Sequence, residues 1–249
     1  MYSKYLLPIL CLLTLAGCMS ASINTEQVNS INRVAIVGFD TFKMSSGEGL
    51  SIGAIMDMTK SKESISNLGE KFYIALGDQL GKEMGWQVLS IDSVKGNPYY
   101  QELYQSARGK TKTRLINGRS VTTEGIAPAK PMRELTKAQK DKLIKSLNVD
   151  SIIFMDSLLA PGKTSSIMGT FSFEKYRVTV DTFTMHNIAS NTPIIEIKRK
   201  VGDTPDKVRS NFSIAGFSTN PSQKEIGLVY AIKEVAKALA EEIKKGGNQ

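Results

Sequence analysis

Cysteine and histidine are scarce in this chain of 249 residues, which contains two cysteines and one histidine. Because cysteine and histidine are so few, a zinc site built from them, a disulfide scaffold and a Cys–His catalytic pair are all disfavoured. Long apolar runs are missing too, since none after the first residues reaches the roughly 18 residues of a membrane-spanning helix. The remaining composition, 41% hydrophobic and 22% charged, is typical of a folded globular protein.

The amino terminus has the order of features found in exported proteins. Lys4 precedes an apolar run over residues 5–15. That run is too short to cross a bilayer as a helix and fits the hydrophobic region of a secretory signal peptide. Small residues Ala16 and Gly17 then precede Cys18. An ordinary signal peptide followed by an incidental cysteine is the simpler alternative.

The tetrapeptide 15–18 (LAGC) resembles the lipobox of bacterial lipoproteins. The resemblance implies that residues 1–17 are a signal peptide, that cleavage precedes Cys18, and that this cysteine is acylated. Two or more acyl chains hold a protein stably on a membrane. Cys11 leaves with the signal peptide, so the mature chain has no free thiol. Aspartate at position 19 would resemble an inner-membrane retention signal, so Met19 favours the outer membrane. We expect the domain to face the periplasm, and the cell exterior is the alternative.

Residues 18–30 are polar and lack an apolar period after the cysteine. This pattern predicts a tether, which if extended would reach about 40 Å from the membrane. The folded domain is therefore expected over residues 31–249.

Apolar runs rich in β-branched residues predict strands, and longer runs with apolar residues at helical spacing predict helices. The strands are expected at 33–39, 86–94, 151–159, 171–186 and 195–201, and the helices at 65–84, after Thr136 and after Ser222. The pairs Thr136 with Gln139 and Ser222 with Glu225 predict capping boxes at the last two helices. Within 171–186 the alternation of apolar residues changes parity, which predicts a β-bulge near Asp181.

Residues 95–130 lack these patterns and are expected to form a hairpin or an extended flap. The dipeptide at 117–118 is Asn-Gly, a strong hairpin signal, and it lies between residues 112–116 and 119–123. The expected fold is a single α/β domain, a mixed β-sheet covered by helices in the order β-α-β-(hairpin)-α-β-β-β-α.

This order behind a lipobox resembles a group of periplasmic domains. They are the curli-secretion channel lipoproteins (CsgG-like), the amino-terminal domain of TolB and the LpoB-type activators of penicillin-binding proteins. The resemblance rests on 33–39 (RVAIVGF), 149–154 (VDSIIF) and 176–180 (YRVTV), which leads to the turn at 187–192 (NIASNT). It implies the same α/β fold and a binding or assembly role in the cell envelope.

One departure from the curli channel concerns its membrane hairpins. That channel inserts two long hairpins per subunit into the outer membrane, and such strands need an apolar lipid-facing side. The hairpin expected here carries Lys112, Arg114 and Arg119, and the loop over 161–170 is too short. We therefore expect an accessory factor that binds another envelope protein. A homo-oligomeric secretion-channel subunit remains the alternative.

The cofactor motifs in the sequence are incomplete. Residues 162–164 (GKT) imitate the end of a phosphate-binding loop, but Ser157 stands where the motif needs glycine. Gly47, Gly49 and Gly53 lack the spacing of a dinucleotide-binding fingerprint. No cofactor or metal is therefore expected.

Three titratable residues are the candidates for acid–base chemistry. His186 has no serine motif to act with, and we expect it at the surface or packed in a hairpin. Asp40 and Asp156 lie at the ends of predicted strands and could be close in space. Paired carboxylates can transfer protons, but loop capping is their commoner role. The protein is therefore expected not to be an enzyme, and a hydrolase of cell-wall or lipid substrates is the weakest alternative.

A basic cluster without an intervening acid is the candidate partner surface. It comprises Arg108, Lys110, Lys112, Arg114 and Arg119. An anionic envelope component or an acidic protein face would suit it, whereas a periplasmic protein does not ordinarily meet nucleic acid. A solvated hairpin whose lysines prevent strand pairing is the alternative. Tyr99, Tyr100 and Tyr104 precede the cluster, and they suit either an interface or packing of the hairpin.

Overall fold

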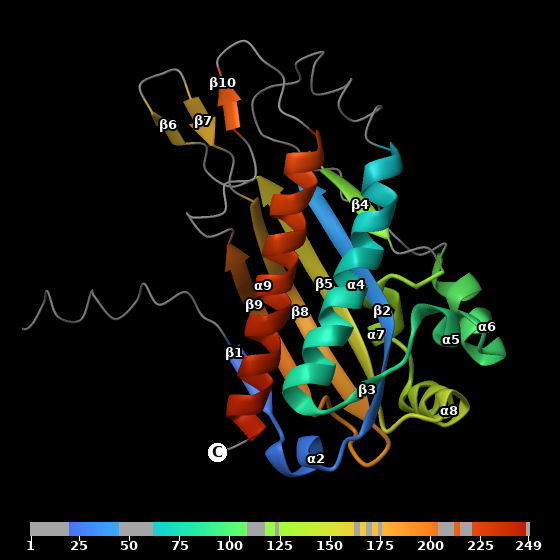
Figure 1. The fold of residues 1–249 in the computed structure, drawn as a ribbon. Helices are drawn as coiled ribbons and strands as arrows, with labels where there is room; N and C mark the ends of the chain where they lie inside the picture. Colours follow the sequence, from blue (N-terminus) through green and yellow to red (C-terminus); the bar gives the residue numbers. More distant parts are fainter. Residues whose placement is uncertain are drawn as a thin grey trace, which may run out of the picture.

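A mixed β-sheet runs through the protein and has helices on both faces (Figure 1). The predicted α/β fold class is thereby confirmed. The computed structural model describes residues 20–44, 62–108, 118–122, 125–161, 165–167, 171–173, 176–203, 212–214 and 221–247. Within these ranges, no helix combines the length and the apolar character that a membrane crossing requires.

The main sheet has the strand order β1-β9-β8-β5-β2-β3, and β4 also pairs with β2. β2 is parallel to β5 and β3, while the other pairs in this sheet are antiparallel. A separate small sheet has the order β10-β7-β6. The strands are β1 (Ser20–Ile23), β2 (Arg33–Met44), β3 (Gln87–Val88), β4 (Gly118–Thr122), β5 (Ser151–Pro161), β6 (Ser165–Ile167), β7 (Phe171–Phe173), β8 (Tyr176–Asn187), β9 (Ile195–Asp203) and β10 (Phe212–Ile214).

Two long helices, α4 and α9, lie side by side on one face of the sheet (Figure 1). On the other face α7 packs on β2 and β5, α8 packs on β5 and β8, and α6 contacts both helices. α5 lies beside β2 and α6, near the β3 edge. The helices are α2 (Thr25–Asn29), α4 (Lys62–Met84), α5 (Ile91–Lys95), α6 (Pro98–Arg108), α7 (Ala129–Arg133), α8 (Lys137–Leu147) and α9 (Pro221–Gly247).

Several local predictions are confirmed. Thr136 and Gln139 form the expected capping box of α8, and this helix ends at Asn148, whose φ is 52°. The left-handed conformation suits asparagine, which adopts it more readily than most residues. In β8, the pairing with β5 passes from Thr182 directly to Val180, so Asp181 is the extra residue of the predicted bulge.

The predicted tether over 18–30 differs from the structure from Ser20 onward. β1 pairs with β9, and α2 follows at once, with Asn24 as its N-cap. The backbone N–H of Asn24 donates to the carbonyl of Ile194 at 2.8 Å, which holds this turn against the sheet. Val28 is buried to 1% exposure and supplies apolar packing that the polar composition concealed.

The predicted strand over 86–94 is wrong beyond β3. The hydroxyl of Ser90 accepts the N–H of Ser93 and caps α5, so the chain turns into a helix after two paired residues. Asn97 caps α6 in the same way, because its Oδ1 accepts the N–H of Tyr100. Side chains that bind nearby backbone N–H groups favour helix starts over strands.

The predicted hairpin or flap over 95–130 is also wrong in the part that the structure describes. That part holds the end of α5, then α6, β4 and the start of α7. β4 pairs antiparallel with β2, so it joins the main sheet as a strand. Residues 112–116 lie outside the described residues.

Three further boundaries differ from prediction. The expected strand over 171–186 is divided between β7 and β8, and β6 lies within the expected loop over 161–170. The last helix begins at Pro221, so Ser222 is inside its first turn and is not its cap. Proline suits the first turn of a helix because its missing N–H has no helical partner there.

The chain before α7 is held close to the middle of β2. A Cβ atom on Gly38 would lie 2.9 Å from Cδ1 of Phe154 and 3.0 Å from Cα of Ala129, so only glycine fits. The N–H of Ala127 donates to the hydroxyl of Tyr100 at 2.8 Å. This hydroxyl donates in turn to the carbonyl of Val37 at 3.1 Å. Tyr100 thus packs inside the protein and bridges two segments, which favours the packing interpretation over an interface.

Candidate functional site

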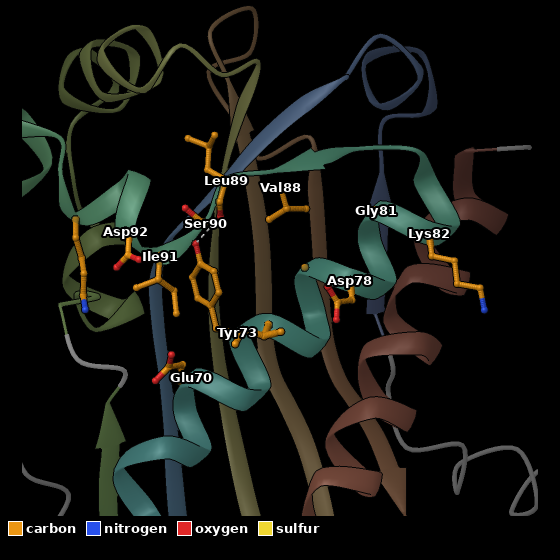
Figure 2. A pocket seen from close by; sticks show the side chains of 13 residues that line it. Glu70, Tyr73, Asp78, Gly81, Lys82, Val88, Leu89, Ser90, Ile91 and Asp92 are labelled. Atoms are coloured by element: carbon orange, nitrogen blue, oxygen red, sulfur yellow. Dashed lines mark hydrogen bonds between the residues drawn. The ribbon is translucent and has the colours of Figure 1, made fainter.

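A groove of about 550 Å³ lies between α4, β3 and α5, at one edge of the main sheet (Figure 2). Ile74 of α4 and Ile91 of α5 line it together with Val88 of β3. Ile74 is 49% exposed, and it is one of the two large apolar side chains that stand out into solvent among the described residues. The groove therefore offers apolar surface that the fold itself does not cover.

Backbone groups of β3 open into this edge. The N–H of Gln87 donates to the backbone carbonyl of Asn32 at 2.7 Å, and the N–H of Leu89 donates to the backbone carbonyl of Val34 at 2.9 Å. In a parallel pair the residue between two such donors directs its own N–H and C=O away from the partner strand. Val88 therefore presents a donor and an acceptor on the side opposite β2.

Two features of α4 shape the groove. Gly77 lies over Val88, and a Cβ atom there would meet Cγ1 of Val88 at 3.5 Å. Because glycine has no Cβ atom, the surface of Val88 at the base of the groove is left open. Tyr73 fixes the helix to the strand ends, because its buried hydroxyl shares its one proton between the carbonyls of Leu89 at 3.2 Å and Ile36 at 3.3 Å.

The charges around the groove are mostly acidic. Glu70, Asp78 and Asp92 are exposed around it, against exposed Lys82 and half-buried Lys95. This local excess of acid contrasts with the formal charge of +8 of the whole chain. An open strand edge with apolar and acidic surroundings suits an extended peptide segment that carries apolar and basic side chains.

The two predicted carboxylates meet on the other face of the sheet. Asp40 and Asp156 are register partners on β2 and β5, so the prediction that they lie close is confirmed, although both sit within strands. The pKa of Asp40 is raised to about 8, most of all by burial and also by the hydrogen bond and the negative charge of Asp156. The N–H of Ala129 and the charge of Arg133 partly oppose this rise.

Both ends of α7 bind this carboxylate pair. At its start the backbone N–H of Ala129 donates to Asp40, and at its end Arg133 forms an ion pair with Asp156. The side chains of Arg133 and Asp156 are 21% and 22% exposed. A carboxylate pair engaged in this way holds a helix on a sheet, which is a structural role.

His186 packs inside the protein, so the surface alternative is wrong and the packing alternative holds. It is 8% exposed, and its ring meets the edge of Phe154 with centroids 5.6 Å apart. The pKa of His186 is lowered to about 4, most of all by burial and also by the charges of Lys140, Lys137 and Arg133, against which the charge of Glu196 acts. The imidazole is therefore neutral at pH 7.

The three tyrosines that precede the basic cluster make packing contacts. Tyr104 stacks on Tyr100 with centroids 6.4 Å apart. The ammonium of Lys142 lies 4.0 Å from the ring centroid of Tyr99, a cation–π contact between α8 and α6. Tyr99 thus joins α6 to α8, whereas the stacking of Tyr104 on Tyr100 lies within α6.

Of the predicted basic cluster, the described residues include only Arg108 and Arg119. Arg108 ends α6, and Arg119 lies in β4 at the register position of Lys43. The rest lie outside the described residues: Cys18, Gly47, Gly49, Gly53, Lys110, Lys112, Arg114 and 162–164.

Sequence patterns did not reveal the groove. Its wall depends on the shortness of β3 and on α5, both of which were predicted as one strand. Gly77 and Gly81, one turn apart on α4, were the available signal. Among the residues that the structure covers, no three His, Cys, Asp or Glu side chains are grouped as metal ligands would be.

Comparison with known proteins adds no relative. No protein-family model matches the chain, and no curated protein matches it either.

Replacing Asp40 by asparagine should flatten the pH dependence of stability. Because its folded-state pKa is raised, native Asp40 holds a proton that the unfolded chain releases between about pH 4 and pH 8. Stability should therefore fall across that window, by at least about 1 kcal/mol. Asp40→Asn should lose most of this slope in urea unfolding at pH 5 and pH 8.

Exposed Asp92→Asn is the matched control and should keep the slope of the unmodified protein. Equal slopes in all three proteins would show that Asp40 ionises freely in the folded state.

Proposed function

We propose that the chain is a bacterial lipoprotein, anchored through Cys18 to the periplasmic side of the outer membrane. Its α/β domain binds another envelope protein and catalyses no reaction. The sequence 15–18 (LAGC) behind an apolar run carries the proposal. Met19 after the cysteine supports the outer membrane as the destination.

The distribution of polar groups supports binding over catalysis. Asp156 is paired with Arg133, and His186 is packed on Phe154. In contrast, the groove beside β3 has an exposed apolar side chain, Ile74, and backbone groups of Val88 that point away from β2. An extended segment of another protein, added along β3, is the contact that these features favour.

The basic cluster is proposed as a second contact, toward an anionic envelope component. This part of the proposal rests on the sequence, which places no acid between its members. They are Arg108, Lys110, Lys112, Arg114 and Arg119.

Cys18→Ala should abolish metabolic labelling of the protein by a palmitate analogue, because it removes the thiol that accepts the lipid. Cys11→Ala is the matched control and should label normally, since this cysteine is discarded with the signal peptide. Labelling that persists in Cys18→Ala would contradict the anchor.

A photoreactive amino acid at Ile74 should crosslink the protein to an envelope protein in growing cells. The same amino acid at Ile188, which is 42% exposed at the β8–β9 turn, is the control and should give no such product. Gly77→Val should reduce the Ile74 product by filling the groove. Equal products from both positions, or none from Ile74, would argue against the groove as the binding site.

A further inference from the structure

One wall of the groove beside β3 is a row of α4 side chains spaced four residues apart. Glu70, Ile74 and Asp78 all line the groove, and each lies about one helical turn from the next. Glu70 and Asp78 are exposed, and Figure 2 shows both on the helix that borders the groove. The wall therefore presents an acid, an apolar side chain and a second acid in that order.

The two carboxylates of this row have no partner within the described part of the protein. Neither Glu70 nor Asp78 forms an ion pair or a side-chain hydrogen bond with a residue that the structure describes. In contrast, Glu83 on the same helix lies 3.7 Å from the ammonium of Lys244. The charges of Glu70 and Asp78 are therefore open to the cations of another molecule.

The two cations that line the groove lie outside this row of three. Lys82 is one helical turn beyond Asp78. The stem of Lys95 packs on the chain before α7, because a Cβ atom on Gly125 would overlap its Cε. Neither lysine lies between Glu70 and Asp78 along the helix, so the acid–apolar–acid order is uninterrupted.

The spacing of the row matches the repeat of an extended chain. Four residues of a helix advance about 6 Å, and two residues of a strand advance about 6.6 Å. α4 and β3 already show this match. A Cβ atom on Gly81 would lie 3.3 Å from the carbonyl oxygen of Trp86. Four residues earlier in the helix and two residues later in the strand, a Cβ atom on Gly77 would lie 3.5 Å from Cγ1 of Val88. A strand added along β3 would therefore place every second side chain opposite successive members of the row.

We infer that the groove selects an extended segment of the pattern basic-x-apolar-x-basic, in which x is any residue. The inference rests on the proposed binding of an envelope protein at this groove and adds the chemistry of the segment that binds. The apolar residue packs against Ile74 and Val88, and the two cations lie beside Glu70 and Asp78. A third cation beyond Asp78 would meet Lys82. The pattern reads the same in both directions, so it applies to a strand parallel or antiparallel to β3.

The occupant is another protein and not a strand of a second copy of this chain. No strand that the structure describes has basic residues two positions before and two positions after an apolar residue. The acidic border of the groove also differs in sign from the whole chain, which has a formal charge of +8.

Peptide binding to the purified protein tests this pattern. The mature protein is extracted from bacterial membranes in detergent, and the binding of fluorescein-labelled peptides is measured by fluorescence anisotropy. One peptide contains Lys-Thr-Val-Thr-Lys. The matched control contains Thr-Lys-Val-Lys-Thr, which has the same composition and charge but directs its lysines to the face of a strand opposite the valine.

The first peptide should bind at least about fivefold more tightly than the control, because two exposed ion pairs together contribute an effect of this order. The double variant Glu70→Gln with Asp78→Asn should lose most of this preference. A matched double variant at exposed acids outside the groove, Glu102→Gln with Glu134→Gln, should keep it.

Failure of the pattern and failure of the proposed function give different results. Equal binding of the two peptides, binding of neither, or a preference that persists without Glu70 and Asp78 would overturn the pattern. A crosslink from Ile74 to a second copy of this chain would overturn it as well. Each of the three peptide results leaves the crosslink from Ile74 to an envelope protein intact, whereas the loss of that crosslink would overturn the proposed function.

Discussion

The parallel pairing of β2 with β5 is the interaction on which the rest of the structure depends. Its register is set at one end, where the carboxylate of Asp150 accepts the N–H groups of Asn32 and Arg33, both at 2.8 Å. This register places Asp40 opposite Asp156 and Gly38 beside Phe154. The close approach of α7, its ion pair and the bridge through Tyr100 all follow from it.

Sequence patterns predicted the elements that depend on local or strongly periodic signals. The apolar run of β2, the capping box of Thr136 and the bulge at Asp181 are such cases, as is the proximity of Asp40 and Asp156. The patterns failed where a few side chains determine whether a short segment forms a strand or a helix. β3 ends after two paired residues because Ser90 caps a helix, and β1 stays in the sheet because α2 and the Asn24 hydrogen bond hold it. The groove is made by these short elements, so no periodicity could reveal it.

Within the proposed function, the two edges of the sheet have different roles: the β1 edge is close to the lipid anchor, and the β3 edge contacts the partner. The β1 edge begins at Ser20, within about 7 Å of the proposed acylated cysteine. The β3 edge has backbone groups of Val88 that point away from β2, and an exposed isoleucine and mostly acidic side chains lie beside it. A rigid sheet between these edges would hold a partner at a set distance from the membrane, which suits an accessory or assembly factor. The buried Asp40 and the neutral His186 serve the packing of that sheet.

The intact mass of the mature protein, measured after detergent extraction from bacterial membranes, tests the central claim most directly. The account predicts a chain that begins at Cys18 and carries the mass of a diacylglyceryl group and one further acyl chain. A chain that begins at any other residue, with Cys18 unmodified or removed, would contradict the anchor.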